Sequence, residues 1–91
     1  MLQKLFKVIE QRKKKPTKNS YTARLIAKGE DKVLQKIGEE AAELIVAAKG
    51  QGNKRVIEEM ADLYYHTLVL LSLKNLSLKD VEKELRNRHK Q

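Results

Sequence analysis

The fold is decided between residues 36 and 62, which read KIGEEAAELIVAAKGQGNKRVIEEMAD. Apolar residues recur at helical spacing on both sides of the Gly50–Gly52 segment. The pattern predicts one helix from about Asp31 to Lys49, with Gly50 as the residue just beyond its end. A second helix is predicted from about Asn53 to Lys74. Because the turn between them is so short, the two helices become antiparallel neighbours and form a helical hairpin.

The remaining segments predict short helices that flank this hairpin. One covers about residues 2–12, and a loop from Arg12 to Ser20 follows it, with a charge run and the only proline. A short helix from Tyr21 to Ala27 is started by Ser20, and a last helix, capped by Ser77, continues to the end of the chain. We therefore expect an all-α domain that spans residues 1–91. Since the flanking helices are too short to cover the apolar hairpin, we also expect a homodimer with a core like a four-helix bundle.

The composition excludes several classes of protein. The chain of 91 residues has no cysteine, so disulfides and thiolate metal sites are ruled out. No apolar run approaches the length of a membrane span, and the first residues, punctuated by lysine, do not resemble a signal peptide. These features predict a cytoplasmic protein with no membrane partner.

The net charge of +8 is distributed unevenly. Residues 1–32 contain ten Lys or Arg against three acids, whereas residues 33–74 contain five against six. A basic helical module that binds nucleic acid is one interpretation, with Lys13–Lys15 among its phosphate contacts. That interpretation does not explain the acidic centre. Basic flanks around an acidic middle also suit a small polyanion that is held by a metal ion and by ammonium groups.

Two pairs of acids lie at the margin of the predicted hairpin seam: Glu40 with Glu43, and Glu59 with Asp62. Three-residue spacing keeps both members of a pair on one side of a helix, about 60° apart. Clustered carboxylates repel one another unless a cation lies among them, and a hard divalent ion such as Mg²⁺ prefers oxygen ligands. The alternative is an ordinary solvated helix face. The metal interpretation predicts an enzyme that acts on a polyphosphate.

Four segments resemble the phosphoribosyl-ATP pyrophosphohydrolase family, which belongs to the all-α pyrophosphohydrolases that include MazG-type enzymes. They are Ser20-Tyr21-Thr22, Lys28-Gly29-Glu30-Asp31-Lys32, Lys36-Ile37-Gly38-Glu39-Glu40-Ala41-Ala42-Glu43 and Glu59-Met60-Ala61-Asp62-Leu63-Tyr64-Tyr65-His66. The acid pairs are general to the superfamily, whereas the first two segments point to this family. The resemblance extends over nearly the whole chain, including Glu84-Leu85-x-x-Arg88-His89.

The resemblance implies Mg²⁺-dependent hydrolysis of phosphoribosyl-ATP between its α and β phosphates, the second step of histidine biosynthesis. The products are phosphoribosyl-AMP and pyrophosphate. A pyrophosphohydrolase for another nucleoside triphosphate is the nearest alternative. By analogy with the family, the metal ligands are Glu40, Glu43, Glu59 and Asp62. Glu39 is the candidate to orient or deprotonate the attacking water, unless it is an ordinary exposed glutamate.

Basic and aromatic residues complete the candidate site. Lys28 and Lys32 are expected to contact phosphate near the start of a long helix, where backbone N–H groups also favour anions. Lys36 is either a further phosphate ligand or the salt-bridge partner of Glu40 one turn later. The remaining candidates each have two interpretations. Arg12–Lys15 form either a mobile lid or solvated surface, and Tyr21 is either a stacking group or a packing anchor. His66 is either a metal ligand or a hydrogen-bond partner of a carboxylate, and Arg86 and Arg88 are either phosphate ligands across a subunit interface or charges that favour a helix end.

Overall fold

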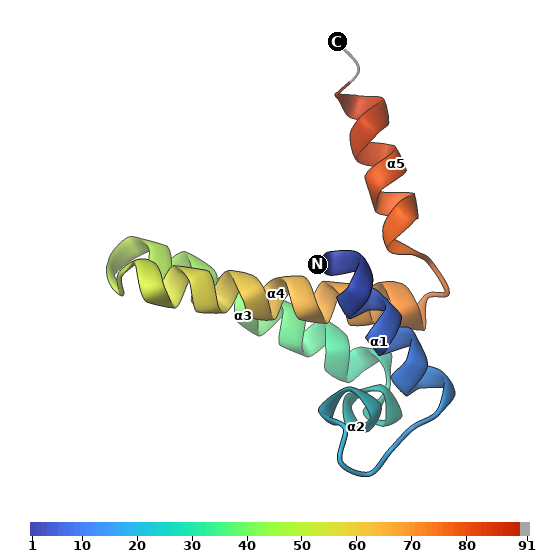
Figure 1. The fold of residues 1–91 in the computed structure, drawn as a ribbon. Helices are drawn as coiled ribbons and strands as arrows, with labels where there is room; N and C mark the ends of the chain where they lie inside the picture. Colours follow the sequence, from blue (N-terminus) through green and yellow to red (C-terminus); the bar gives the residue numbers. More distant parts are fainter. Residues whose placement is uncertain (90–91) are drawn as a thin grey trace.

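A computed structural model describes residues 1–89 and shows an all-α fold (Figure 1). Five helices make up this part of the chain: α1 (Leu2–Lys14), α2 (Tyr21–Lys28), α3 (Glu30–Gly50), α4 (Asn53–Leu73) and α5 (Leu78–Arg88). No strand occurs within residues 1–89. The predicted fold class is therefore confirmed. None of these helices is long and apolar enough to cross a membrane.

The predicted helical hairpin is present, and its two helices α3 and α4 lie side by side (Figure 1). Helix α3 continues through Gly50, so the prediction that Gly50 lies beyond the helix end is wrong. The left-handed conformation occurs instead at Gly52, where φ is 90°, directly before α4 begins. A side chain there would strain the backbone, which explains why the turn between the two long helices needs glycine at this position.

Both predicted serine caps are present. The Ser20 hydroxyl accepts a hydrogen bond from the backbone N–H of Ala23 and starts α2. Ser77 starts α5 in a capping box, in which the Asp80 carboxylate also accepts a bond from the Ser77 backbone N–H. Helix α5 ends at Arg88, so the prediction that the last helix continues to the end of the chain is wrong for His89, and residues 90–91 lie outside the described residues.

Helix α1 is longer than predicted, because Arg12, Lys13 and Lys14 belong to it and not to a loop. Basic side chains favour the negative end of a helix. Lys13 is also anchored: its Nζ lies 2.5 Å from the Ser72 carbonyl oxygen and 3.2 Å from the Asn75 Oδ1, near the end of α4. Arg12, Lys13 and Lys14 are thus helical, and Lys13 is held against the end of α4.

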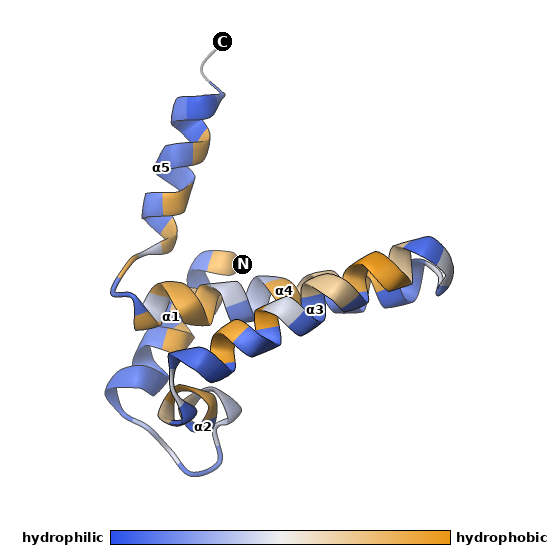
Figure 2. Cartoon of the chain, turned by 180° about the vertical axis from the view of Figure 1, so that it is seen from behind, coloured by the Kyte–Doolittle hydropathy of each residue, from blue (hydrophilic) through white to orange (hydrophobic). Residues whose placement is uncertain are grey.

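The core lies at the end of the hairpin away from its turn. It contains Ile9 from α1, Leu25 from α2, Val33 from α3, Leu68 and Val69 from α4, and Leu78 from α5. Nearer the turn, the hairpin has no cover within the described chain. Ile45 is 65% exposed and Ile57 is 68% exposed. Figure 2 shows orange, hydrophobic stretches along this part of the hairpin. Apolar side chains of α3, such as Leu34 and Ile45, therefore point outward in a single chain.

Candidate active site

The antiparallel contact between α3 and α4 brings the two predicted acid pairs together in a specific way. Glu40 and Glu59 are buried between the helices, at 7% and 2% exposure, whereas Glu43 and Asp62 are exposed. Each pair thus contributes one buried and one exposed carboxylate. Because helix periodicity places both members of a pair on the same side, this difference arises from the way the helices pack.

Glu40 meets a histidine at the seam. Its Oε1 lies 2.5 Å from the Nδ1 of His66, which is 4% exposed. The predicted hydrogen bond between His66 and a carboxylate is therefore present. Among residues 1–89, the ion-pair partner of Glu40 is His66 and not Lys36.

Glu59 is the most deeply buried acid in the described chain. Its Oε2 accepts a hydrogen bond from the Nη2 of Arg55 at 2.7 Å, one helical turn earlier. Its Oε1 is buried and has no hydrogen-bond partner within residues 1–89. The neighbouring carboxyl of Glu43 raises the pKa of Glu59, chiefly because the protonated form of Glu59 could donate a hydrogen bond to it. Burial and repulsion by the charge of Glu43 raise it further, and Arg55 lowers it.

The remaining candidate acids point outward. Glu39 is exposed and accepts a hydrogen bond from Gln35 Nε2 at 3.0 Å. Asp62 has an exposed side chain, while its backbone carbonyl lies 3.0 Å from His66 Nδ1. Within residues 1–89, no three side chains of His, Cys, Asp or Glu are gathered as a preformed metal group. Across the seam, Glu40 instead contacts His66, and Glu43 on α3 raises the pKa of Glu59 on α4.

These carboxylates suit a divalent cation chemically. Mg²⁺ prefers oxygen ligands and usually keeps several water molecules, so it requires few protein ligands in a fixed cage. Glu59 Oε1 is buried without a hydrogen-bond partner among residues 1–89, and the charge of Glu43 raises the pKa of Glu59, so a cation near these two acids would counter that effect. The oxygen donors of the seam are therefore of the kind that a magnesium ion prefers.

The three candidate lysines lie where α2 ends and in the first two turns of α3. Lys28 is the last residue of α2, Lys32 lies in the first turn of α3, and Lys36 follows one turn later. Lys28 is exposed, and the other two are partly buried. None of the three forms a salt bridge within the described residues, so their ammonium groups remain available for an anion.

Helix α2 reaches the acidic seam through two tyrosine contacts that the sequence analysis did not anticipate. The Tyr21 hydroxyl lies 3.3 Å from His66 Nε2, and the Thr22 hydroxyl is hydrogen-bonded to the Tyr65 hydroxyl. Burial raises the pKa of Tyr65. Tyr21 remains 47% exposed, so one edge of its ring faces solvent while its hydroxyl is anchored. The Tyr64-Tyr65-His66 run was the available signal, but helix periodicity alone did not show which ring faces α2.

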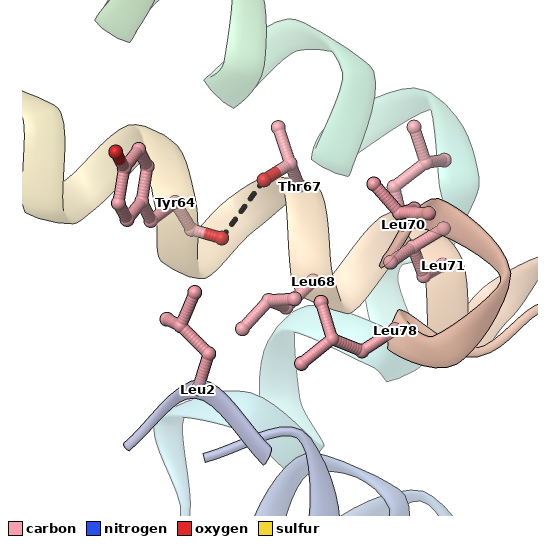
Figure 3. Close-up of a pocket in the computed structure, with 8 residues that line it drawn as sticks. Leu2, Tyr64, Thr67, Leu68, Leu70, Leu71 and Leu78 are labelled. Carbon is pink, nitrogen blue, oxygen red and sulfur yellow. Dashed lines mark hydrogen bonds between the residues drawn. The ribbon is translucent and has the colours of Figure 1, made fainter. Parts of the chain in front are cut away.

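Two other features lie apart from the acids. Arg88 is on α5, which projects away from the hairpin (Figure 1), and its Nε contacts Glu84 Oε1 at 3.1 Å. Within one chain it is therefore not brought to the acidic seam. An apolar groove of about 360 Å³ lies between α4 and the starts of α1 and α5, as Figure 3 shows. It is lined by Leu2, Tyr64, Thr67, Leu68, Leu70, Leu71, Leu78 and Val81. Without an acid or a base, this groove does not suit a polyphosphate.

Several known proteins are similar to this chain in sequence. The sequence profile of the family described as phosphoribosyl-ATP pyrophosphohydrolase matches residues 2–89. A protein named phosphoribosyl-ATP pyrophosphatase from Bacillus cytotoxicus is 49% identical over 88 residues, covering 97% of this chain and 82% of that protein. One of the same name from Clostridium acetobutylicum is 51% identical over 89 residues, covering 98% and 81%. Another from Bacillus cereus is 51% identical over 85 residues, covering 93% and 79%.

Proposed function

Because the chain belongs to the phosphoribosyl-ATP pyrophosphohydrolase family, we propose that it hydrolyses phosphoribosyl-ATP to phosphoribosyl-AMP and pyrophosphate. The bond that breaks joins the α and β phosphates, and the reaction is the second step of histidine biosynthesis. The observation that carries the proposal is the pair of Glu43 and Glu59. A buried carboxylate with an unpaired oxygen beside a second carboxylate suits a divalent cation, and a polyphosphate substrate is commonly held by the same kind of ion.

The four acids of the two pairs would hold the ion: Glu40, Glu43, Glu59 and Asp62. When bound, Mg²⁺ neutralises charge that develops on the phosphate oxygens and lowers the pKa of coordinated water. The protein contributes rigid placement of two of these ligands. Glu40 is fixed by His66, and Glu59 is fixed by Arg55, so each keeps one oxygen directed away from its protein partner.

Glu39 is our candidate for handling the attacking water. Its carboxylate is exposed, and its contact with Gln35 leaves the second oxygen available to accept a proton or a hydrogen bond. It is adjacent to Glu40 in sequence but diverges from the seam by about 100° around the helix. A carboxylate beside a metal site, but not bound to the ion, suits the role of a base.

Substrate phosphates would be held at the start of α3. The N–H groups of its first turn favour anions, and Lys28, Lys32 and Lys36 add positive charge along the path toward the acids. The partly exposed ring of Tyr21 is placed to contact the nucleoside end of a substrate bound there. Arg88 is too distant within one chain, so a contact with phosphate would require the second subunit.

We further propose that the active protein is a homodimer. Helix α4 carries an exposed apolar groove lined by Val56, Ile57, Met60, Ala61 and Tyr64. Ile45 on α3 is exposed at the same end of the hairpin. A second hairpin packed against this surface would bury these side chains and complete a bundle of four helices. Charged substrates do not account for such a surface, whereas a second copy of the hairpin does.

The test is the release of pyrophosphate from phosphoribosyl-ATP, compared with a panel of ordinary nucleoside triphosphates, with Mg²⁺ or with EDTA. We expect release from phosphoribosyl-ATP alone and only with the metal. Release from ordinary triphosphates but not from phosphoribosyl-ATP would contradict the substrate and leave the reaction class standing. Equal rates in EDTA would contradict the role of the acidic seam.

A further inference from the structure

Three side chains connect the surface of α2 with the buried acid of α3. The Tyr21 hydroxyl lies 3.3 Å from His66 Nε2, and His66 Nδ1 lies 2.5 Å from Glu40 Oε1. Tyr21 is 47% exposed, whereas His66 and Glu40 are buried, at 4% and 7% exposure. Each residue belongs to a different helix, so the series joins α2, α4 and α3.

The direction of the hydrogen bonds follows from the atoms that surround the imidazole. Two acceptors face Nδ1: the Glu40 carboxylate and the backbone carbonyl of Asp62 at 3.0 Å. The proton of a neutral imidazole must therefore be on Nδ1, which donates to Glu40. Nε2 then carries a lone pair, and the Tyr21 hydroxyl donates to it. Tyr21 thereby favours the tautomer in which the histidine can hold Glu40.

The imidazole is also fixed by packing. The Tyr65 ring meets it edge to face, with the ring centroids 4.9 Å apart and the planes at 77°. Tyr21 packs against the same two rings, at 6.2 Å from His66 and 6.1 Å from Tyr65. A ring held on several sides transmits a change at one nitrogen to the other nitrogen, because it has little freedom to rotate.

We propose that Tyr21 and His66 are positioning residues that orient the Glu40 carboxylate for its metal ion, so that the state of α2 sets the affinity of the site for that ion. Hydrogen bonds from partners outside the ligand shell commonly change metal affinity about ten- to a hundredfold. The inference rests on the proposed function, since it takes Glu40 as a metal ligand. It adds that a residue on a different helix, 19 positions earlier in the sequence, contributes to metal binding without touching the metal.

A merely structural role for Tyr21 is separable from this one. Helix α2 has a second polar attachment to α4, the hydrogen bond between Thr22 and Tyr65, which does not involve Glu40. Removing the Tyr65 hydroxyl loosens α2 and leaves the series from Tyr21 to Glu40 intact. Tyr65→Phe is therefore the matched control for Tyr21→Phe, since each variant deletes one hydroxyl that joins the same two helices.

The experiment measures Mn²⁺ binding, with Mn²⁺ as a spectroscopic substitute for Mg²⁺, by electron paramagnetic resonance of the free ion without substrate. We expect Tyr21→Phe to weaken binding about tenfold and Tyr65→Phe to leave it within about twofold. His66→Asn retains a donor near the Nδ1 position but cannot reach Tyr21. In that background, Tyr21→Phe should have no further effect, because the connection between the residues is already broken. Circular dichroism establishes that each variant is folded.

Unchanged Mn²⁺ affinity in Tyr21→Phe would overturn the proposal, and so would equal losses in Tyr21→Phe and Tyr65→Phe. Additive losses from Tyr21→Phe and His66→Asn would also overturn it. If the unsubstituted protein bound no Mn²⁺, the metal site itself would be wrong, and the positioning role with it. Failure of the proposed function is thus seen in the parent protein, whereas failure of this inference is seen only in the variants.

Discussion

Arg55 donates a hydrogen bond from Nη2 to the Oε2 of Glu59, at 2.7 Å, and so balances one side of a carboxylate that is 2% exposed. The same guanidinium contacts Glu58 at 2.7 Å on the surface. The opposite oxygen of Glu59 is buried and has no partner within residues 1–89. The seam between α3 and α4 therefore carries a buried carboxylate that is paired on one side only, and this leads to specific predictions.

Replacing Glu59 with Gln should reduce Mg²⁺-dependent pyrophosphate release at least about a hundredfold, since metal catalysis contributes several kcal/mol. The amide keeps an oxygen for Arg55 and removes the repulsion with Glu43, so the melting temperature without metal should not fall. Steady-state kinetics and thermal denaturation provide the two measurements. Glu58→Gln is the control, because Glu58 contacts Arg55 but is exposed. Full activity in Glu59→Gln would contradict the assignment.

The stability of the metal-free protein should depend on pH through Glu59. Its pKa in the folded state is raised above the ordinary value of 4.5, chiefly by the neighbouring carboxyl of Glu43. Above that pH, the folded protein keeps a proton that the unfolded chain has released, so the free energy of unfolding falls as pH rises through the folded-state pKa. Chemical denaturation in EDTA over a pH series tests this. Glu59→Gln should flatten this part of the curve, and parallel curves for both proteins would refute the prediction.

Arg55→Gln should weaken Mg²⁺ binding most at low pH, so that a higher pH is needed to reach the same affinity for the ion. The guanidinium lowers the pKa of Glu59, so its loss allows a proton to compete more strongly with the ion. We expect the Mg²⁺ concentration for half-maximal activity to rise, with the greatest increase in acidic buffer. Arg55→Lys restores the charge and should recover part of the loss. An increase that is the same at every pH would instead indicate an effect on folding or on substrate binding.

Ile57→Lys should weaken the proposed dimer. Ile57 is 68% exposed in one chain and lies in the apolar groove of α4. Burying an isoleucine contributes about 1.5–3 kcal/mol, so its loss should raise the dimer dissociation constant at least tenfold. Sedimentation equilibrium measures the change. Val8→Lys on α1, also at an exposed apolar position, is the control and should keep the mass of the parent protein. A monomeric parent protein at every concentration would disprove the dimer.

The two serine caps allow stability to be separated from function. Ser20→Ala and Ser77→Ala each remove one N-cap and should each lower the free energy of unfolding by about 1 kcal/mol. Only Ser20→Ala should also weaken Mg²⁺ activation, because α2 carries Tyr21 while α5 projects away from the seam (Figure 1). Urea denaturation and Mg²⁺ titration of activity give the comparison. Equal losses of activation in both variants would mean that the effect is global.

Local sequence was sufficient for the secondary structure. The caps at Ser20 and Ser77, the interruption at Gly50–Gly52 and the helical spacing of apolar residues are properties of neighbouring residues, and the helices follow them closely. One helix end was not predicted, because it depends on a contact that is distant in the sequence. The end of α1 depends on Lys13, whose partners Ser72 and Asn75 are far away in the chain.

The roles of individual acids depended on more than periodicity. Sequence spacing identified Glu40, Glu43, Glu59 and Asp62 as a group, and the resemblance to a family gave that group a chemistry. It did not distinguish the buried members from the exposed ones. Nor did it indicate Arg55 as the counter-charge of Glu59, although their spacing of one helical turn is a recognisable signal for an ion pair.

The sequence by itself determined the helices, the hairpin and the presence of four acids along it, because hydrophobic period, capping and turn chemistry act over a few residues. Only the tertiary structure decided that Glu40 faces His66 and that Glu59 lies beside Glu43. It also decided that Tyr21 reaches the seam from α2. These contacts depend on how far one helix is shifted and rotated against another, which is set by the packing of many side chains at once.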